Sequence, residues 1–194
     1  MAKPITFDHP LHAGQGKEVS LTKETLAKVK KIIARYPKGH QKSALLPVLH
    51  IVQEELGGSL DVDIMDYVAS LLSIQPIEVY EVATFYTQYY LEKVGKYVIE
   101  VCRTGPCALV GGEDIADYLE QKLQIKTGET TPDGLFTLRR VECLGACGYG
   151  PVMQVNTEFY EQLTTEKIDS LIEDFKGRAN QEKPKESKWV EKFS

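Results

Sequence analysis

The four cysteines of this sequence fall into two close pairs, and paired thiols can bind metal or exchange electrons. Cys102 and Cys107 are separated by four residues, and Cys143 and Cys147 are separated by three. Three kinds of site use four thiols: a structural zinc ion, two redox disulfides, and an iron–sulfur cluster. We therefore expect the chemistry of the chain at these four positions.

The spacing within each pair ranks these three kinds of site. Zinc ribbons and thioredoxin redox motifs favour two residues between cysteines, and neither pair has that spacing. A four-iron ferredoxin needs three cysteines in a tight run, which this sequence lacks. A two-iron cluster takes two thiolates on each iron, and nearby glycines let backbone N–H groups approach its sulfur atoms. These glycines are Gly105, Gly145, Gly148 and Gly150. The spacing favours a [2Fe–2S] cluster but leaves zinc and disulfides open.

Each cysteine pair follows an apolar run that predicts a β-strand, over 97–102 and over 136–141. A helix over 109–124 connects the two strands, so we expect them to be parallel. Two loops at strand ends can then converge on one metal site. Cys107 would lie just before this helix, whose free N–H groups and positive dipole end favour an anionic cluster.

The remaining elements of this part of the chain are a hairpin and a helix. Val152–Val155 and Phe159–Leu163 flank Asn156-Thr157-Glu158, which predicts a β-hairpin. Thr164 should cap a last helix that buries Ile168, Leu171, Ile172 and Phe175. The predicted order is β-α-β-β-β-α.

Four helices are predicted before residue 96, in a region without cysteine. The first runs from a Thr22 cap to Tyr36-Pro37, and the second from Ser43 to Leu56 with Pro47 in its first turn. The third begins at Asp61 or Asp63, and the fourth runs from Gln75-Pro76 to about Phe85. The expected buried residues of the first and third helices are Leu26, Val29, Ile32, Ile33, Ile64, Tyr67, Val68, Leu71 and Leu72.

Composition limits the classes of protein to which the chain can belong. It has 194 residues, of which 42% are hydrophobic and 26% charged, as in a soluble globular protein. The net charge of −5 argues against a nucleic-acid partner. No apolar run approaches the roughly 20 residues of a membrane span, so we expect no membrane insertion. The N-terminus shows neither a secretion signal nor an Arg-rich import sequence, which favours metal or redox chemistry over a disulfide scaffold.

Both cysteine motifs resemble those of one family. Cys102-Arg103-Thr104-Gly105-Pro106-Cys107 and Glu142-Cys143-Leu144-Gly145-Ala146-Cys147 are similar to motifs of the thioredoxin-like [2Fe–2S] ferredoxin subunit in the NADH dehydrogenase module of respiratory complex I, the NADH:quinone oxidoreductase. The resemblance covers about residues 20 to 176. It includes Leu46-Pro47-Val48-Leu49-His50 with Gln53-Glu54-Glu55, and Glu81-Val82-Ala83-Thr84-Phe85-Tyr86. It implies one [2Fe–2S] cluster, bound by Cys102, Cys107, Cys143 and Cys147.

The resemblance also implies a fold class and a division of the chain. We expect an α+β protein, with a helical bundle followed by a thioredoxin-like α/β domain that has a mixed four-stranded sheet. The expected boundaries are a flexible arm over 1–19, a helical docking bundle over 20–92, the [2Fe–2S] domain over 96–176, and a polar tail over 177–194.

In this family, the subunit lies against the subunit that binds NADH and flavin, and its cluster exchanges single electrons with that flavin. The resemblance therefore implies an electron-transfer subunit that is not a catalyst alone, with that flavin-binding subunit and further iron–sulfur subunits as partners. Its expected location is the cytoplasmic, peripheral side of a bacterial membrane complex. The same subunit type serves NAD-linked hydrogenases and formate dehydrogenases, which the motifs do not separate. An alternative of another class is a zinc-stabilised four-cysteine interaction module.

Some further residues are candidates for a site. The histidines, which lie away from the cysteine pairs, are His9, His12, His40 and His50, and we expect His50 to be packed or solvated. The sequence has no dinucleotide fingerprint and no phosphate-binding GK[ST] loop, so we expect no NADH or flavin site. The arginines beside the cysteine pairs are Arg103, Arg139 and Arg140; they either carry solvated charge or attract the cluster or a partner's acidic rim. Trp189 and Phe193 end an unstructured tail or anchor it on a partner.

Overall fold

The chain forms two compact units, which are divided between Lys93 and Val94. The structure is a computed structural model that describes residues 16–179. The expected arm up to residue 15 and the expected tail from residue 180 lie outside the described residues. In the described part of the chain, none of the helices has the length and apolar character needed to span a membrane.

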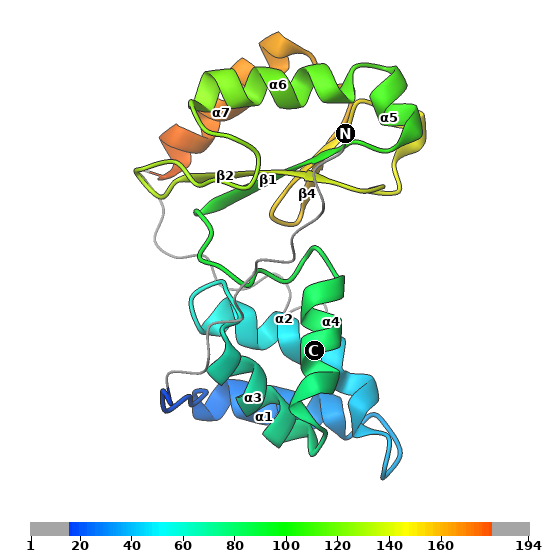
Figure 1. The fold of residues 1–194 in the computed structure, drawn as a ribbon, viewed down its shortest axis with the longest axis vertical. Helices are drawn as coiled ribbons and strands as arrows, with labels where there is room; N and C mark the ends of the chain where they lie inside the picture. The colour runs from blue at the N-terminus through cyan, green and yellow to red at the C-terminus, as the bar shows by residue number, and fades with distance from the viewer. Residues whose placement is uncertain (1–15, 180–194) are drawn as a thin grey trace, which may run out of the picture. The chain divides into compact units, whose positions relative to one another are not determined.

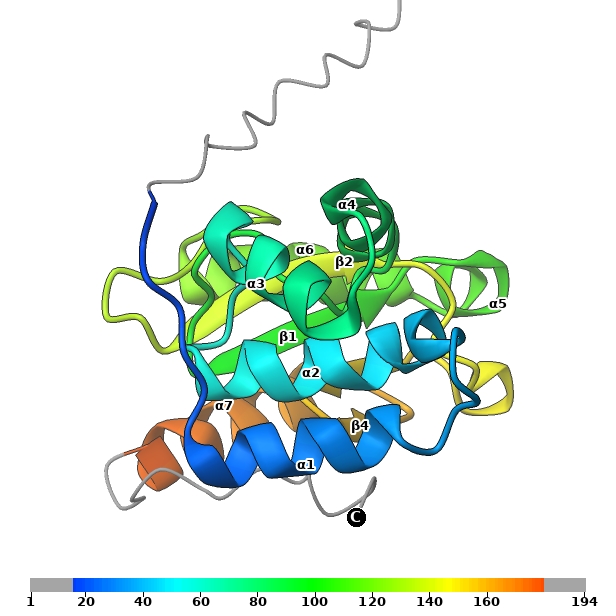
Figure 2. The same cartoon turned by 90° about the horizontal axis from the view of Figure 1, so that it is seen from below.

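The first unit is built from helices, with bounds close to those predicted. They are α1 (Lys23–Ile33), the 3-10 helix η1 (Gln41–Ala44), α2 (Leu45–Glu55), α3 (Val62–Leu72) and α4 (Pro76–Phe85). Figure 2 shows α1 and α2 running side by side. The predicted caps are confirmed: the Thr22 side chain accepts a hydrogen bond from Thr25 N at 3.2 Å, and Asp61 accepts one from Ile64 N at 2.9 Å.

Two helix ends in this unit differ from the prediction. The helix expected from Ser43 is a 3-10 turn followed by α2, with Pro47 still in the first turn of α2. Helix α1 ends at Ile33, and beyond the cap residue Ala34 the N–H groups of Arg35 and Tyr36 bond to carbonyls three residues back. This tightening precedes Pro37, which disfavours helical geometry in the residue before it.

The core of the first unit surrounds α2, which is buried on most of its sides. Its buried side chains include Leu45, Val48, Leu49, Ile51 and Val52. Helix α3 contacts both α2 and α4, and for this reason the set of side chains that it buries differs from the predicted set. It buries Met65 and Ala69, whereas the expected Tyr67 and Leu71 are half-buried, as are Leu26 and Ile33 in the first helical segment.

The second unit contains a mixed four-stranded sheet, as predicted. Its strands are β1 (Tyr97–Cys102), β2 (Phe136–Val141), β3 (Met153–Val155) and β4 (Glu158–Tyr160), in the order β2-β1-β3-β4. The β1–β2 pair is parallel, and the other two pairs are antiparallel. Helices α6 (Gly112–Leu123) and α7 (Thr165–Ala179) lie on one face of this sheet (Figure 1).

An apolar core fills the space between this face and the two helices. It joins Ile99 and Val101 of β1 to Leu119 of α6 and to Ile168 and Ile172 of α7. Thr164 caps α7 as predicted, by accepting a hydrogen bond from Lys167 N at 3.2 Å. Helix α7 continues to Ala179, so the first three residues of the expected polar tail are helical.

The helix predicted over 109–124 is present as α6, but it begins three residues later than predicted, and a short helix before it was not predicted. Helix α5 (Gly105–Leu109) contains Cys107, and α6 begins only at Gly112. Gly111 separates them with a φ of 96°, a conformation that glycine adopts without strain and that interrupts a helix. Cys107 therefore lies within the short helix α5 and not directly before α6.

The hairpin is shorter than predicted because its second strand ends at Tyr160. Asn156 makes the turn with a φ of 54°. Gln162 also has positive φ, 48°, and its N–H bonds to the carbonyl of Tyr149, while Leu163 N bonds to the carbonyl of Pro151. Residues 162–163 thus lie beyond the last strand, and their backbone hydrogen bonds fix the position of the segment that follows the second cysteine pair.

Candidate metal centre

The two cysteine pairs lie at the same edge of the sheet, because the strands that precede them are parallel. Cys102 is the last residue of β1 and is aligned with Val141, the last residue of β2. Arg103 N donates to the carbonyl of Val141 at 3.0 Å, which ties the two loops together where they begin. Cys143 follows two residues after Val141. The convergence predicted from the two strand ends is therefore present.

The four sulfur atoms are close enough to influence one another. All four are free thiols, and Cys143 Sγ lies 3.8 Å from Cys147 Sγ. Burial raises the pKa of the Cys107 thiol, and Cys102 and Cys147 raise it further. The hydrogen bond with Cys143 raises the pKa of Cys147, and the charge of Cys102 adds to that shift. Thiolates held this close repel one another, so the site favours a bound cation that removes the repulsion.

The two pairs differ in their exposure to solvent. Cys102 and Cys107 are each 2% exposed, whereas Cys143 and Cys147 are exposed. The buried pair packs against Val152, with Leu144 and Ala146 of the second loop also in contact with this small cluster. A group bound by all four thiols would be enclosed on one side and open to solvent on the other.

Two glycines allow the backbone to close around the first pair. A Cβ atom on Gly112 would lie 2.8 Å from the carbonyl oxygens of both Cys102 and Cys107. A Cβ atom on Gly150 would lie 2.8 Å from Val110 Cγ2 and 3.6 Å from Cys107 Sγ. Gly150 was predicted to allow close approach, but Gly112 was missed. The only signal for it in the sequence is the Gly111-Gly112 pair soon after Cys107.

The other predicted glycines have different roles. Gly145 has a φ of 79°, and its N–H donates to Cys143 Sγ at 3.3 Å, as expected for a bond that stabilises a thiolate. The ideal Cβ positions of Gly105 and Gly148 meet no atom within 4 Å. Of the four predicted glycines, Gly145 therefore donates its N–H to a sulfur atom as predicted, and Gly150 lies close to Cys107 without such a bond in the described residues.

The arrangement of the thiols fits a two-iron cluster. Among residues 16–179, no group of three or more His, Cys, Asp or Glu side chains is gathered closely enough to bind a single metal ion. The thiols form two pairs, and a [2Fe–2S] cluster takes two thiolates on each iron. The Gly145 N–H bond to sulfur is of the kind that surrounds such clusters.

The arginines beside the cysteine pairs each lie near a carboxyl group. Arg139 Nη1 lies 3.4 Å from Glu100 Oε1, a carboxyl whose pKa burial raises to about 7. Arg140 forms ion pairs with Glu113 and Asp117 of α6. Both side chains therefore pair with carboxyl groups of β1 and α6. Arg103 lies exposed, 3.9 Å from Glu142.

His50 is packed in the first unit, away from the cysteine motifs in sequence. It is 9% exposed, its ring is tilted against Tyr89, and its Nε2 lies 3.3 Å from Gln88 Nε2. Burial lowers the pKa of His50 to about 4, so the ring is neutral near pH 7 and can accept the amide proton of Gln88. His40 is exposed, and His9 and His12 lie outside the described residues.

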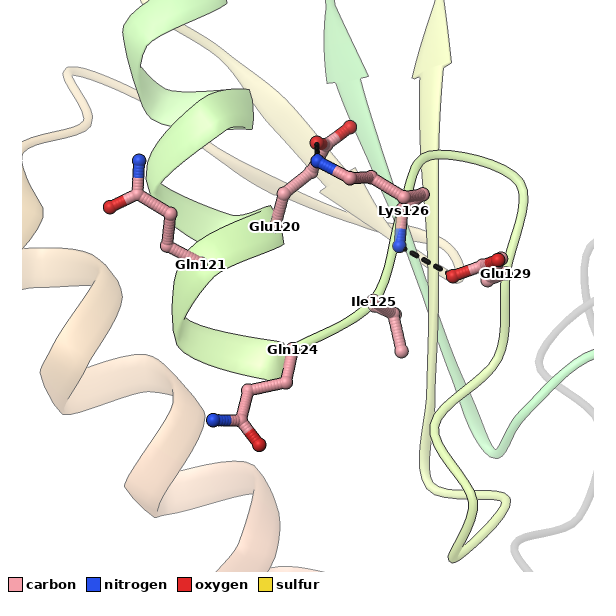
Figure 3. A pocket seen from close by; sticks show the side chains of 6 residues that line it. All are labelled: Glu120, Gln121, Gln124, Ile125, Lys126 and Glu129. Atoms are coloured by element: carbon pink, nitrogen blue, oxygen red, sulfur yellow. Dashed lines mark hydrogen bonds and ion pairs between the residues drawn. The ribbon is translucent and has the colours of Figure 1, made fainter.

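A shallow pocket of about 220 Å³ lies at the other end of α6 (Figure 3). It is lined by Glu120, Gln121, Gln124, Ile125, Lys126 and Glu129. Lys126 Nζ pairs with Glu120 at 2.9 Å, and Lys126 N donates to Glu129 at 2.7 Å, so both carboxylates already have partners. Helix α6 has 12 residues and is about 18 Å long, which separates this pocket from the cysteine loops.

The chain is similar in sequence and in fold to known proteins. Residues 29–176 match the family model described as thioredoxin-like [2Fe-2S] ferredoxin. A protein of Rickettsia felis, named as a subunit of NADH-quinone oxidoreductase, is 47% identical over 153 residues, which cover 79% of this chain and 92% of that protein. The mitochondrial NADH dehydrogenase [ubiquinone] flavoprotein 2 of Dictyostelium discoideum is 45% identical over 155 residues, which cover 80% of this chain and 63% of that protein.

A solved structure of NAD+-reducing [NiFe]-hydrogenase, in the air-oxidised state, has the same fold. Its TM-score is 0.59 at 22% identity, and the match covers 69% of this chain and 23% of the hydrogenase chain. At this identity the likeness concerns the fold alone. The family match and the curated relatives confirm the resemblance carried by the two cysteine motifs. The chain belongs to the thioredoxin-like [2Fe-2S] ferredoxin family.

Proposed function

We propose that this chain is the electron-transfer subunit of an NADH:quinone oxidoreductase, and that Cys102, Cys107, Cys143 and Cys147 bind its single [2Fe–2S] cluster. The observation that carries the proposal is the convergence of the two cysteine pairs at one edge of the sheet. The relatives support the choice of complex, since the Rickettsia felis protein is named as part of NADH-quinone oxidoreductase.

A [2Fe–2S] cluster supplies one-electron transfer when bound. The protein residues determine how it is held and from which side it is reached. Cys102 and Cys107 would hold the enclosed side, against Val152 and the backbone of Gly112. Cys143 and Cys147 would hold the side that faces solvent, with Gly145 N–H stabilising the Cys143 thiolate. Electrons would therefore enter and leave past the second pair.

The proposed partner is a subunit that binds both NADH and flavin. NADH delivers two electrons together as a hydride, and a flavin can pass them on one at a time. Because the sequence has neither a dinucleotide fingerprint nor a phosphate-binding loop, we assign both molecules to the partner. Further iron–sulfur subunits would receive electrons within the same complex. The chain would lie at the cytoplasmic, peripheral side of a bacterial membrane complex.

The helical region over 20–92 is proposed as a docking element for the partner subunits. Its support is a set of large apolar side chains on α4 that remain exposed: Phe85 is 77% exposed and Ile77 is 59% exposed. Tyr86 stacks edge-on against Phe85, with ring centroids 5.0 Å apart. Exposed apolar side chains that adjoin one another mark protein–protein contacts, whereas isolated ones are common on any surface.

The test follows the visible spectrum of the purified chain under anaerobic conditions. Dithionite should reduce the cluster by one electron, and NADH alone should not. Addition of the flavin-bearing partner should give NADH-dependent reduction. If the flavin-free chain is bleached rapidly by NADH without a partner, then it binds the nucleotide itself and the assignment to an electron-transfer subunit is wrong.

A further inference from the structure

Three large apolar side chains around the cysteines are exposed. Leu109 is 89% exposed, Val110 is 54% exposed and Tyr149 is 55% exposed. Leu109 ends α5, which contains Cys107, and Tyr149 ends the 3-10 helix η2 (Cys147–Tyr149), which begins with Cys147. Each apolar side chain is thus two or three residues from a cysteine of the same loop.

These side chains belong to one continuous surface, because the two cysteine loops touch there. A Cβ atom on Gly150 would meet Val110 Cγ2 at 2.8 Å, so the first loop packs directly on the residue after Tyr149. Gln162 N donates to the carbonyl of Tyr149 at 2.8 Å, which fixes this segment from the other side. We name Leu109, Val110 and Tyr149 the apolar rim.

The two segments that carry the rim contain no charged residue, and the exposed pair of Arg103 and Glu142 stands just before them in the sequence. Residues 104–112 contain no Asp, Glu, Lys or Arg, and neither do residues 143–157, although 26% of the chain is charged. Charge is depleted at the centres of protein–protein interfaces, where aromatic residues are enriched. A membrane surface or a nucleic acid would instead require basic residues, which these two segments lack.

We propose that the apolar rim is the surface on which the flavin-bearing subunit docks, with a complementary apolar and uncharged surface covering Cys143 and Cys147. This inference rests on the proposed function and adds the contact residues to it. The flavin-bearing subunit is chosen as the occupant because of where the exposed thiols lie. Cys143 and Cys147 come between Val110 and Tyr149 in the sequence, and Cys147 is only two residues before Tyr149. A partner that exchanges electrons here must come close to that pair, and an apolar rim expels water from the space between them.

The test measures binding of the purified cluster-loaded chain to the purified flavin-bearing subunit by titration. Leu109→Glu and Tyr149→Glu should each weaken binding by about tenfold or more, because a charge would be buried at the centre of the contact. The matched control is Phe159→Glu, since Phe159 is 49% exposed but lies on β4 of the same unit. The control should change binding less than about twofold.

A second measurement separates docking from cluster binding. Both rim variants should keep the visible spectrum and the one-electron reduction by dithionite, because neither side chain is a thiol or is buried. Wild-type affinity in both variants would overturn the rim as docking surface and leave the proposed function standing. Absence of binding by the wild-type chain would instead overturn the proposed function. If the variants lose self-association while partner binding is unchanged, then a second copy of the chain occupies the rim, and the assignment to the flavin-bearing subunit is wrong.

Discussion

Gly112 determines how closely the first cysteine loop folds back on the end of β1. Its Cα faces the carbonyl oxygens of Cys102 and Cys107, with no room for a methyl group. Backbone atoms cannot swing aside as a flexible side chain can, so a larger residue must displace one of the two cysteines. The geometry of the buried pair therefore depends on a residue that carries no chemistry itself.

Gly112→Ala should lower the cluster content of the purified protein and lower its free energy of unfolding by about 1–3 kcal/mol, as overpacking does. Gly177→Ala is the matched control, because the Cβ position of Gly177 in α7 meets no atom within 4 Å. Iron content and urea unfolding of both variants are the measurements. A Gly112→Ala protein with full iron content would mean that the contact is relieved without moving the cysteines.

Each of the four cysteines should be needed for a normal cluster. Replacement of Cys102, Cys107, Cys143 or Cys147 by Ala should abolish the cluster or leave it unstable, since a four-thiolate centre loses one ligand. The visible spectrum and the iron-to-protein ratio after anaerobic reconstitution measure this. A single variant that keeps the wild-type spectrum would remove that cysteine from the ligand set.

His50 should make stability depend on pH. Its pKa is lowered from 6.5 to about 4 by burial. Above pH 6.5 neither the folded nor the unfolded form carries the proton. As pH falls from 6.5 towards 4, the unfolded form binds a proton that the folded form does not, so stability falls by at most about 3 kcal/mol.

Urea unfolding of wild type and His50→Gln at pH 7 and pH 4.5 isolates this effect from that of the carboxylates. The variant should lose less stability on acidification than the wild type does. His40→Gln, at an exposed histidine, is the control and should behave as the wild type. Equal acid sensitivity of all three proteins would show that His50 contributes nothing to it.

Among the secondary-structure elements, the parallel β1–β2 pair positions the site. Its strands were predictable because the apolar runs at 97–102 and 136–141 stand out from polar surroundings. The break between α5 and α6 was not predictable from the apolar pattern, since it depends on a left-handed Gly111 and on the close contact of Gly112 with backbone oxygens. The burial of one cysteine pair and the exposure of the other likewise arise from tertiary packing.

Arg140 of β2 holds α6 against the sheet. It pairs with Glu113 and Asp117 and approaches Glu120 at 3.5 Å, so three carboxylates on one side of a helix share one guanidinium group. Arg140→Ala would leave these like charges four and three residues apart, which destabilises a helix.

We expect Arg140→Ala to lower the free energy of unfolding by on the order of 1 kcal/mol, a modest value because solvent screens the partly exposed pairs. Arg178→Ala removes a single exposed pair with Asp174 and should have a smaller effect. Urea unfolding at low and at high salt measures both, and the difference between the variants should narrow in high salt. An Arg140 variant as stable as Arg178→Ala would contradict this role.

In the molecule as a whole, the two units have different proposed roles: one binds the cluster and the other docks on partner subunits. All four thiols lie in the unit that begins at Val94, and the exposed Phe85 and Ile77 lie in the helical unit. The two hydrophobic cores are separate sets of side chains, each built within one unit. Each unit therefore has the core that an independently folding domain requires.

A fragment of residues 94–194 should still assemble a cluster but bind the partner complex more weakly, because the helical docking element is missing. Phe85→Glu in the full chain should reproduce part of that loss while leaving the cluster intact. Cluster content and partner affinity are the two readouts. Full affinity of the fragment would remove the docking role from residues 20–92.

Metal and sulfide analysis of the purified wild-type chain decides whether the four thiols, in their two pairs, bind a two-iron cluster. We predict about two irons and two acid-labile sulfides per chain, a red-brown colour, and a paramagnetic state after one-electron reduction. A colourless protein with one zinc ion per chain and no sulfide would contradict this assignment, and would identify the four cysteines as a structural zinc site.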